Sequence, residues 1–431
     1  MIGGRVIDML FVKECKKTVF SVTFWLYVIT VVIMYGSQFG EELDGPLTPP
    51  REGSGNYGTV VKEEPEILMP AAAEGLVSEY LRGSYSAYPL LFYKEVKLSA
   101  DKTARMAGII EELTGISAEE LNGFAEYEEA GMQVYLDENG QEHWEYREAT
   151  LPEIHMPENL TYERFRELMQ EADKLIGGGS QYSEQFLMGN FSRIPMDYEE
   201  ALAEYEGVVA DSNIASAYTR LFCDYLGIVL SVLPVFVCVS LWMMDRRAHM
   251  EPLVYVRSCS SVKIVGTRYL ALVVCMSIPV FLTYLHGMWN VVGLYPDKHF
   301  HWGQAFGLMA FWLFPGILIV SALGVLLSEL TSPLVVIFLQ AAWWFMSIST
   351  NRLTGSITKW TLVIRHNSLY GTEVFQRQFG NFVVNRCAYI VLSLLCVGLA
   401  MFLYDRKRKG VLILGRRNDH GKGRKANQKL R

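Results

Sequence analysis

The sequence predicts an all-α polytopic membrane protein with six transmembrane helices and a mostly α extracellular domain that contains a small β-hairpin. Three observations predict this fold class. Six stretches of the chain are apolar enough to enter a bilayer. The first stands apart from the other five, because the long acidic segment 37–218 separates them. Basic residues gather beside those ends of the stretches that a 1+5 topology places in the cytoplasm.

The six apolar stretches set the number of predicted helices. A helix needs about 20 apolar residues to cross about 30 Å of hydrocarbon. The stretches are 18–36, 221–244, 269–289, 305–327, 333–349 and 387–404. A soluble core helix of this length would show a polar face, and none of the six does. We expect the first stretch to stay as an anchor, because no small-residue cleavage site follows it.

Lysine and arginine predict the direction of the chain through the membrane. The residues before the first stretch include Arg5, Lys13, Lys16 and Lys17, and the tail 406–431 holds 11 basic residues and one acid. Both termini are therefore expected in the cytoplasm. We assign the tail to the anionic lipid surface and not to nucleic acid. The segment 351–385 does not follow this rule for basic residues: the six-span topology places it outside, but it holds four basic residues and one acid.

These observations divide the chain into five parts. The predicted parts are a cytoplasmic amphipathic helix (1–17), a first transmembrane helix (18–36), an extracellular acidic domain (37–218), five further transmembrane helices with their loops (219–404) and a basic cytoplasmic tail (405–431).

The predicted extracellular domain differs sharply in composition from the rest of the chain. It holds 36 acidic and 12 basic residues, a net charge of −24, and none of the seven cysteines. A eukaryotic secreted domain of this size would be expected to carry disulfides, so the composition favours a bacterial plasma membrane. The acid could attract cationic ligands, although solubility alone also explains it.

Local signals predict the elements of this domain. Pro70 is expected to start a helix that Gly83 ends, and Gly115 is expected to end a helix over 101–114. Ser117 opens a capping box, and 161–176 reads as an amphipathic helix closed by glycines. The alternating stretches 132–136 and 143–146 flank Asn139-Gly140, which predicts a hairpin.

Motifs for chemistry are largely missing from the sequence. There is no Walker A phosphate loop and no zinc-binding H-E-x-x-H, so we expect no catalytic residue, metal or cofactor in this chain. Ser54 lies between glycines in a loop and is a weak nucleophile candidate. His286, His299 and His301 lie near one outer loop, where interfacial histidines are commoner than metal ligands.

Two polar residues in the apolar stretches are candidate pathway or interface groups. A charge inside a transmembrane stretch is a functional hypothesis by default, and Asp224 lies one turn into the second stretch beside Arg220. Its position also fits a contact with the outer interface. Gln340 is a polar group in the fifth stretch, where an interhelical hydrogen bond is the expected role.

The inner loop after the second stretch runs from Asp245 through Glu251 and the small residues 258–261 to Lys263 or Arg268. In this order of residues it resembles the loop of the type-2 ATP-binding-cassette (ABC) exporter permeases. In that family an acidic residue precedes a short helix, a small-residue turn follows, and a basic residue opens the next span. Pro252 and Cys259 depart from the family pattern. Three other parts resemble the same family: the N-terminal amphipathic helix, a re-entrant outer segment (351–385) and the basic stop after Asp405. The large insert between the first and second stretches resembles that of a subgroup of these permeases.

The resemblance implies a transport subunit that is not itself an enzyme. A separate P-loop ATPase subunit would bind ATP and Mg, and a second permease copy would complete the transporter. The cargo would be a lipid, a peptide or a hydrophobic compound. The coupling loop 245–264 would receive the ATPase. Its candidate contact residues are Asp245, Arg246, Arg247, Glu251, Arg257 and Lys263.

Two other functions remain open at this point. One is a polytopic membrane sensor whose acidic domain captures a ligand. The other is a membrane-embedded hydrolase or metalloenzyme that uses Ser54 or the three histidines. A neighbouring gene for a P-loop ATPase would favour the transporter, and one for a histidine kinase would favour the sensor.

Overall fold

The computed structural model divides the chain into two compact units. It describes residues 2–62, 64–88, 93–124, 131–136, 142–147, 150–184, 186–256, 259–354, 357, 360–365 and 368–411. The helical unit consists of Met1–Pro49 and Ala203–Arg431, and the inserted unit is Pro50–Leu202. The inserted unit is therefore shorter at both ends than the predicted domain 37–218, because the chain on either side packs with the long helices.

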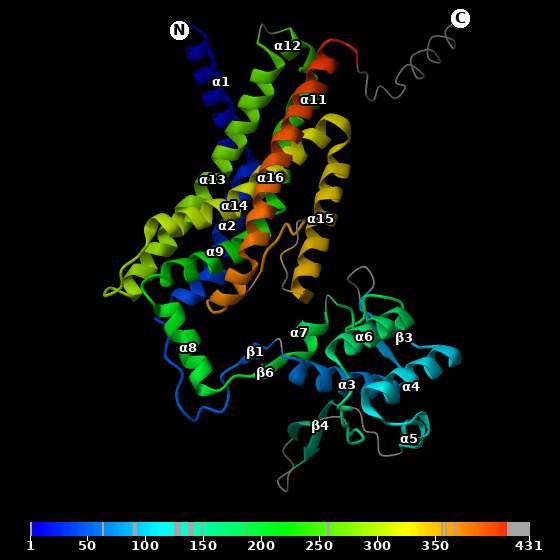
Figure 1. Ribbon diagram of the computed structural model, residues 1–431. Coiled ribbons are helices and arrows are strands. Elements are labelled where there is room, and N and C mark those ends of the chain that lie inside the picture. The colour runs from blue at the N-terminus through cyan, green and yellow to red at the C-terminus, as the bar shows by residue number, and fades with distance from the viewer. Residues whose placement is uncertain are drawn as a thin grey trace, which may run out of the picture. The chain divides into compact units, whose positions relative to one another are not determined.

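The helical unit contains the apolar helices. Its elements are α1 (Ile2–Val19), α2 (Val22–Met34), a π-turn (Tyr35–Phe39), a 3-10 turn (Gly40–Leu43), α8 (Tyr198–Val209, which begins in the inserted unit), α9 (Ile214–Leu230), α10 (Leu233–Trp242), α11 (Met244–Arg247), α12 (Glu251–Tyr255), α13 (Ser261–Leu294), α14 (Trp302–Leu330), α15 (Pro333–Thr354) and α16 (Thr372–Arg408). Helix α14 packs along α9 and α16, and α1 lies along α13 (Figure 1).

Four of the described helical segments are long and apolar enough to cross a membrane. They are Val22–Leu43, Ser261–Leu294, Trp302–Leu330 and Thr372–Arg408. The pair α9 and α10 makes a fifth if it counts as one bent span. The apolar part of α15, Pro333–Ile348, is shorter than the others. The described chain is thus mostly helical and polytopic, with four or five candidate spans where the sequence predicts six.

The second predicted span is broken, which the sequence analysis did not anticipate. Helix α9 ends at Leu230, α10 begins at Leu233, and the two are bent by 42°. The break frees backbone carbonyls, which are costly when no donor reaches them in apolar surroundings. Side chains of α15 supply the donors: Gln340 Nε2 lies 2.7 Å from the carbonyl oxygen of Ser231, and Trp344 Nε1 lies 2.8 Å from that of Ile228. The expected interhelical hydrogen bond of Gln340 is confirmed.

The predicted segment 351–385 is only partly non-helical. Helix α16 begins at Thr372, well before the apolar stretch 387–404, because a helix can continue through polar residues that hydropathy excludes. The described residues between α15 and α16 form no regular element. Their backbone is held by side chains. Ser347 Oγ accepts from the Leu362 and Val363 amides at 2.7 and 3.1 Å, and Asn385 Nδ2 donates to the Thr361 carbonyl at 3.0 Å.

The inserted unit is a helical domain with small sheets. Its elements are β1 (Thr59–Val61), α3 (Pro65–Arg82), β2 (Tyr85–Ala87), β3 (Lys94–Val96), α4 (Ala100–Thr114), α5 (Ala118–Gly123), β4 (Gly131–Leu136), β5 (Glu142–Arg147), α6 (Tyr162–Ile176), α7 (Leu187–Phe191) and β6 (Arg193–Pro195). Among the described residues three antiparallel two-stranded sheets form: β1 with β6, β2 with β3, and β4 with β5. The pairing of the predicted strands 132–136 and 143–146 is confirmed by β4 and β5, and the two other sheets were missed because strands of three residues carry too short a pattern to detect.

Most of the predicted signals in this unit are confirmed. The glycines at 83, 115 and 177 end α3, α4 and α6 in left-handed conformations, and Ser117 forms the capping box. The start of α3 was wrong: Pro65 takes the first turn, and Pro70 lies inside the helix. The Asn139-Gly140 turn of the predicted hairpin lies outside the described residues.

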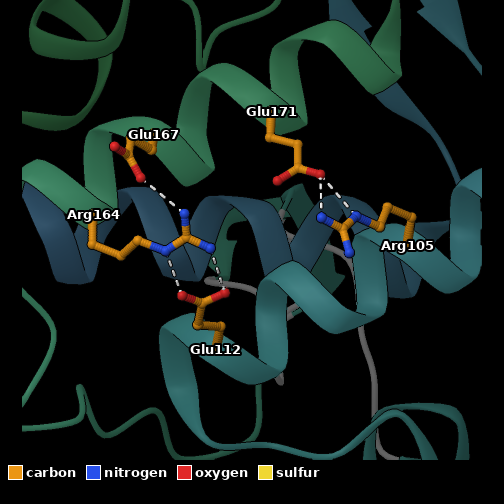
Figure 2. Close-up of polar contacts among 5 residues, drawn as sticks. All are labelled: Arg105, Glu112, Arg164, Glu167 and Glu171. Carbon is orange, nitrogen blue, oxygen red and sulfur yellow. Dashed lines mark hydrogen bonds and ion pairs between the residues drawn. The ribbon is translucent and has the colours of Figure 1, made fainter.

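Ion pairs on the surface of the inserted unit join α4 to α6 (Figure 2). Arg164 on α6 holds Glu112 on α4 through two nitrogens, at 2.6 and 2.9 Å, and also contacts Glu167 at 2.8 Å. Arg105 on α4 reaches Glu171 on α6 at 2.6 Å. Both side chains of each interhelix pair remain partly exposed, so each pair orients the two helices more than it stabilises them.

The Arg164–Glu112 pair predicts a pH-dependent stability. The hydrogen bond from Arg164 holds the pKa of Glu112 below its usual range. A carboxylate with a lowered pKa stabilises the fold above its unfolded pKa, and this stabilisation is lost as the pH falls through the folded pKa. We expect Glu112→Gln to speed hydrogen–deuterium exchange in α4 and α6 modestly at neutral pH. The difference from wild type should vanish in acid.

The control for this prediction is Glu111→Gln, since Glu111 is an exposed neighbour on the same helix. An equal effect of both substitutions, or an effect of Glu112→Gln that persists at acid pH, would contradict the proposed role of the pair.

Candidate functional site

The connection between α10 and α13 folds into two short helices. Helix α11 is followed by His249, whose φ of 53° turns the chain, and α12 begins at Glu251 with Pro252 in its first turn. Proline suits this position because its missing amide hydrogen would be unpaired there in any case. Ser260 then caps α13 by accepting from the Lys263 amide at 3.4 Å. The positive φ at His249, the proline at the start of α12 and the serine cap of α13 therefore fix the local backbone of the loop.

Arg268 holds the start of this loop. Its guanidinium lies 2.5 Å from Asp245 and 3.6 Å from Glu14, and it stacks 6.0 Å from the ring of Trp242. The side chains of Arg268, Asp245 and Glu14 are only 13, 21 and 12% exposed. Charges this buried are stable only when they are paired. The cluster therefore joins α1, α10, α11 and α13.

A second buried ion pair lies beside the first. Lys407 on α16 contacts Glu329 on α14 at 2.7 Å, with side chains that are 9 and 7% exposed. Trp242 Nε1 donates to the same carboxylate at 2.7 Å. Because Trp242 also stacks on Arg268, the two ion pairs form one network across the end of the helical unit.

The far end of the loop is tied to α16 through its backbone. Arg408 donates from Nε to the Tyr255 carbonyl at 2.8 Å and from Nη1 to the Cys259 carbonyl at 2.6 Å. Ser261 Oγ donates to Asp405 at 2.9 Å. Figure 1 shows α12 at the same end of the helical unit as the start of α1 and the end of α16.

A small cavity lies under the loop. It has a volume of about 20 Å³ and is lined by residues of the network, among them Arg268, Glu329, Ser328 and Tyr404. The hydroxyls of Ser328 and Tyr404 are buried, with no hydrogen-bond partner in the described structure. A space of this size holds about one water molecule. The cavity is too small for a substrate and does not make this site an active site.

The outward side of the loop is apolar with a basic surround. Leu253, Val256 and Val262 are 63, 84 and 59% exposed. The exposed basic side chains around them are Arg246, Arg247 and Lys263. We call this set of six residues the loop surface. The backbone contacts described above hold the loop while these side chains stay exposed, although Arg246 also lines the cavity under the loop.

The predicted contact residues thus fall into three groups. Arg246, Arg247 and Lys263 lie on the loop surface, although Arg246 also approaches the sulfur of Met243 at 3.6 Å. Asp245 faces inward to Arg268 and anchors the loop. The backbone of Glu251 begins α12, but its side chain and all of Arg257 lie outside the described residues.

The other candidates are distributed along the chain. Asp224 is 1% exposed on α9, one turn beyond Arg220, so it lies inside the helical unit instead of at its surface. His286 hydrogen-bonds Tyr35 at 2.7 Å, and His301 lies 3.4 Å from the Asp211 carbonyl. Among the described residues no three His, Cys, Asp or Glu side chains gather as metal ligands.

Sequence reasoning missed the anchoring residues. The sequence analysis did not single out Glu14 or Glu329, counted Lys407 and Arg408 only in the basic tail, and considered Arg268 only as the basic residue before a span. The available signal was the position of each charge within about two turns of an apolar stretch, where the helix end is still inside protein. Their pairing could not be read, because the partners are far apart in sequence.

We predict that Arg268→Met destabilises the helical unit. The substitution leaves Asp245 nearly buried without its cation, which typically costs about 3–5 kcal/mol, whereas Glu14 keeps Lys17 at 2.8 Å. Arg247→Met removes an exposed cation from the same loop and should be nearly neutral. Thermal unfolding of the detergent-purified variants measures the difference. If the two variants unfold alike, the network does not hold the loop.

The geometry therefore gives a loop that is anchored by nearly buried ion pairs to α1, α13 and α16 and that exposes apolar and basic side chains. The chain matches no protein family model, no curated protein and no solved structure.

Proposed function

We propose that this chain is the membrane subunit of an ABC exporter. It would move a lipid, a peptide or a hydrophobic compound out of the cell while a separate subunit hydrolyses ATP. The loop surface is the observation that carries the proposal. Exposed apolar side chains with basic neighbours on a firmly held loop suit a contact with a protein or with the membrane surface, and the proposal takes the protein to be the ATPase.

The anchoring of the loop supports a mechanical role. A partner that displaces the loop also displaces the ion-pair network, because Asp245 belongs to both. The network includes residues of α1, α13, α14 and α16, so the displacement reaches several helices at once. The sequence has no phosphate loop, and ATP and Mg would bind the partner ATPase.

The proposal includes a topology. The bent pair α9–α10 would form one span and α15 another, which gives six. The termini would be cytoplasmic, the inserted unit extracellular and the membrane the bacterial plasma membrane. Such transporters need two membrane halves, so a second permease copy would pair with this one.

Cysteine labelling tests this topology. In a cysteine-free background, a single cysteine in place of Gly140 should react with a membrane-impermeant maleimide in intact cells. A cysteine in place of Gly421 should react only after permeabilisation. The opposite labelling at either position would contradict the six-span orientation.

The loop surface predicts how variants affect the partner. The chain and a P-loop ATPase encoded beside it should co-purify, and the chain alone should hydrolyse no ATP. We expect Val256→Asp to reduce co-purification, because it places a charge in an apolar contact. Glu251→Ala and Arg257→Ala should act in the same direction, since loss of one member of a charged contact costs about 2 kcal/mol, roughly thirtyfold in affinity.

Membrane insertion of these variants should be unchanged, because none of the three residues lies in a candidate span. Arg377→Ala is the control, since Arg377 is exposed near the other end of α16. Wild-type co-purification of all three loop variants, or ATP hydrolysis by the isolated chain, would falsify the two-subunit proposal.

A further inference from the structure

Arg386 is a buried cation, and two of its three guanidinium nitrogens have no hydrogen-bond partner in the described structure. It lies on α16 and is 2% exposed. The two nitrogens without a partner are Nε and Nη1. Its guanidinium packs 5.7 Å from the Phe382 ring and 6.0 Å from the Tyr389 ring. A buried guanidinium held only by aromatic rings is costly, because its desolvation is not repaid by an anion.

Arg220, which lies nearby on α9, is a buried cation in the same region that does have hydrogen-bond acceptors. It donates to the Leu369 carbonyl and to Thr372 Oγ1, both at 3.0 Å. It also stacks 5.7 Å from Phe375. Arg220 therefore has a structural role at the start of α16, whereas the described structure assigns no such role to Arg386.

A third unused donor lies in the same aromatic cluster. Trp312 on α14 is 1% exposed and its Nε1 has no partner in the described structure. Its ring centroid is 5.0 Å from that of Phe382 and 5.4 Å from that of Phe375. Phe382 thus packs against both Arg386 and Trp312, and each of these offers an N–H donor. The N–H donors of a guanidinium and an indole can bind an oxyanion, and the neighbouring phenylalanine rings suit an apolar body attached to it.

The aromatic cluster continues to the surface of the helical unit. Phe379, which is 47% exposed, packs 5.9 Å from Phe382 and 5.8 Å from Phe375. Phe379 therefore connects the cluster that contains Phe382 and Arg386 to the exposed surface of the unit. The segment beside the cluster is held by the neighbours of Arg386 on α16, because Asn385 donates to the Thr361 carbonyl and Tyr389 to the Trp360 carbonyl.

We infer that Arg386 binds the phosphate of an anionic lipid, with Trp312 as a second donor and the phenylalanines against the apolar part of the molecule. A guanidinium presents paired N–H groups that match phosphate geometry, and a site among aromatic rings favours a phosphate that arrives on a lipid. The inference deepens the proposed function, since it makes an acidic lipid the substrate class. The lipid-binding test of this inference needs no ATPase, so its outcome does not depend on whether the proposed exporter function is correct.

The test measures thermal unfolding of the full-length chain, purified in a neutral detergent, on addition of phosphatidylglycerol, phosphatidylcholine or inorganic phosphate. Phosphatidylglycerol should raise the unfolding midpoint of wild type, and the other two should not. For Arg386→Met, binding of phosphatidylglycerol should weaken by roughly thirtyfold or more, as for removal of one member of a buried charge pair. Arg386→Lys should retain part of the response, and Arg377→Met should behave as wild type.

The unfolding midpoint without lipid separates binding from a structural role. Arg386→Met should match or exceed wild type, because an apolar side chain relieves an unpaired buried charge. A lower midpoint for both Arg386→Met and Arg386→Lys would mean that Arg386 supports the fold, and would overturn the inference. Equal responses to phosphatidylglycerol and phosphatidylcholine, or a response of wild type to inorganic phosphate alone, would also overturn it.

Discussion

The helical unit depends on one constraint: backbone amides and carbonyls in apolar surroundings must find partners. Continuous helices meet it internally, and most of the unit is built from them. Where the chain departs from helix, polar side chains of neighbouring elements meet it instead. Gln340 and Trp344 cover the break between α9 and α10, and Ser347 serves the segment before α16. These few side chains permit an irregular backbone where apolar residues alone would not.

Charged groups follow different rules in the two units. In the inserted unit the arginines of α4 and α6 reach carboxylates across an exposed surface, where water screens each pair. At the loop end of the helical unit, Arg268 and Lys407 are nearly buried with their carboxylates, so each pair requires its exact partners in place. Pairs of basic residues and carboxylates therefore orient two helices in the inserted unit, whereas in the helical unit they anchor the loop.

The sequence could predict the apolar helices and several helix ends, because long apolar runs, capping residues and terminal glycines are local signals. The hydropathy pattern located the apolar part of each helix more closely than it located the residues at which the helix begins and ends. Helix α13 begins at Ser261, eight residues before the apolar stretch, since its first turns contain Lys263 and Arg268, which interrupt the apolar run. The break after Leu230 was hidden because the composition on both sides is uniformly apolar. The loop was predicted as the candidate site, but its anchors were not, because Glu14 and Arg268 are distant in sequence.

Helix α16 is much longer than a membrane is thick. Its 37 residues span about 55 Å, against about 30 Å of hydrocarbon. It contains no proline, whereas α13 and α14 contain Pro279 and Pro315. Arg408 ties one end to the loop backbone, and Arg386 lies in the opposite half. The helix is therefore a single rod, and a tilt imposed at its loop end moves the buried guanidinium without any intervening joint.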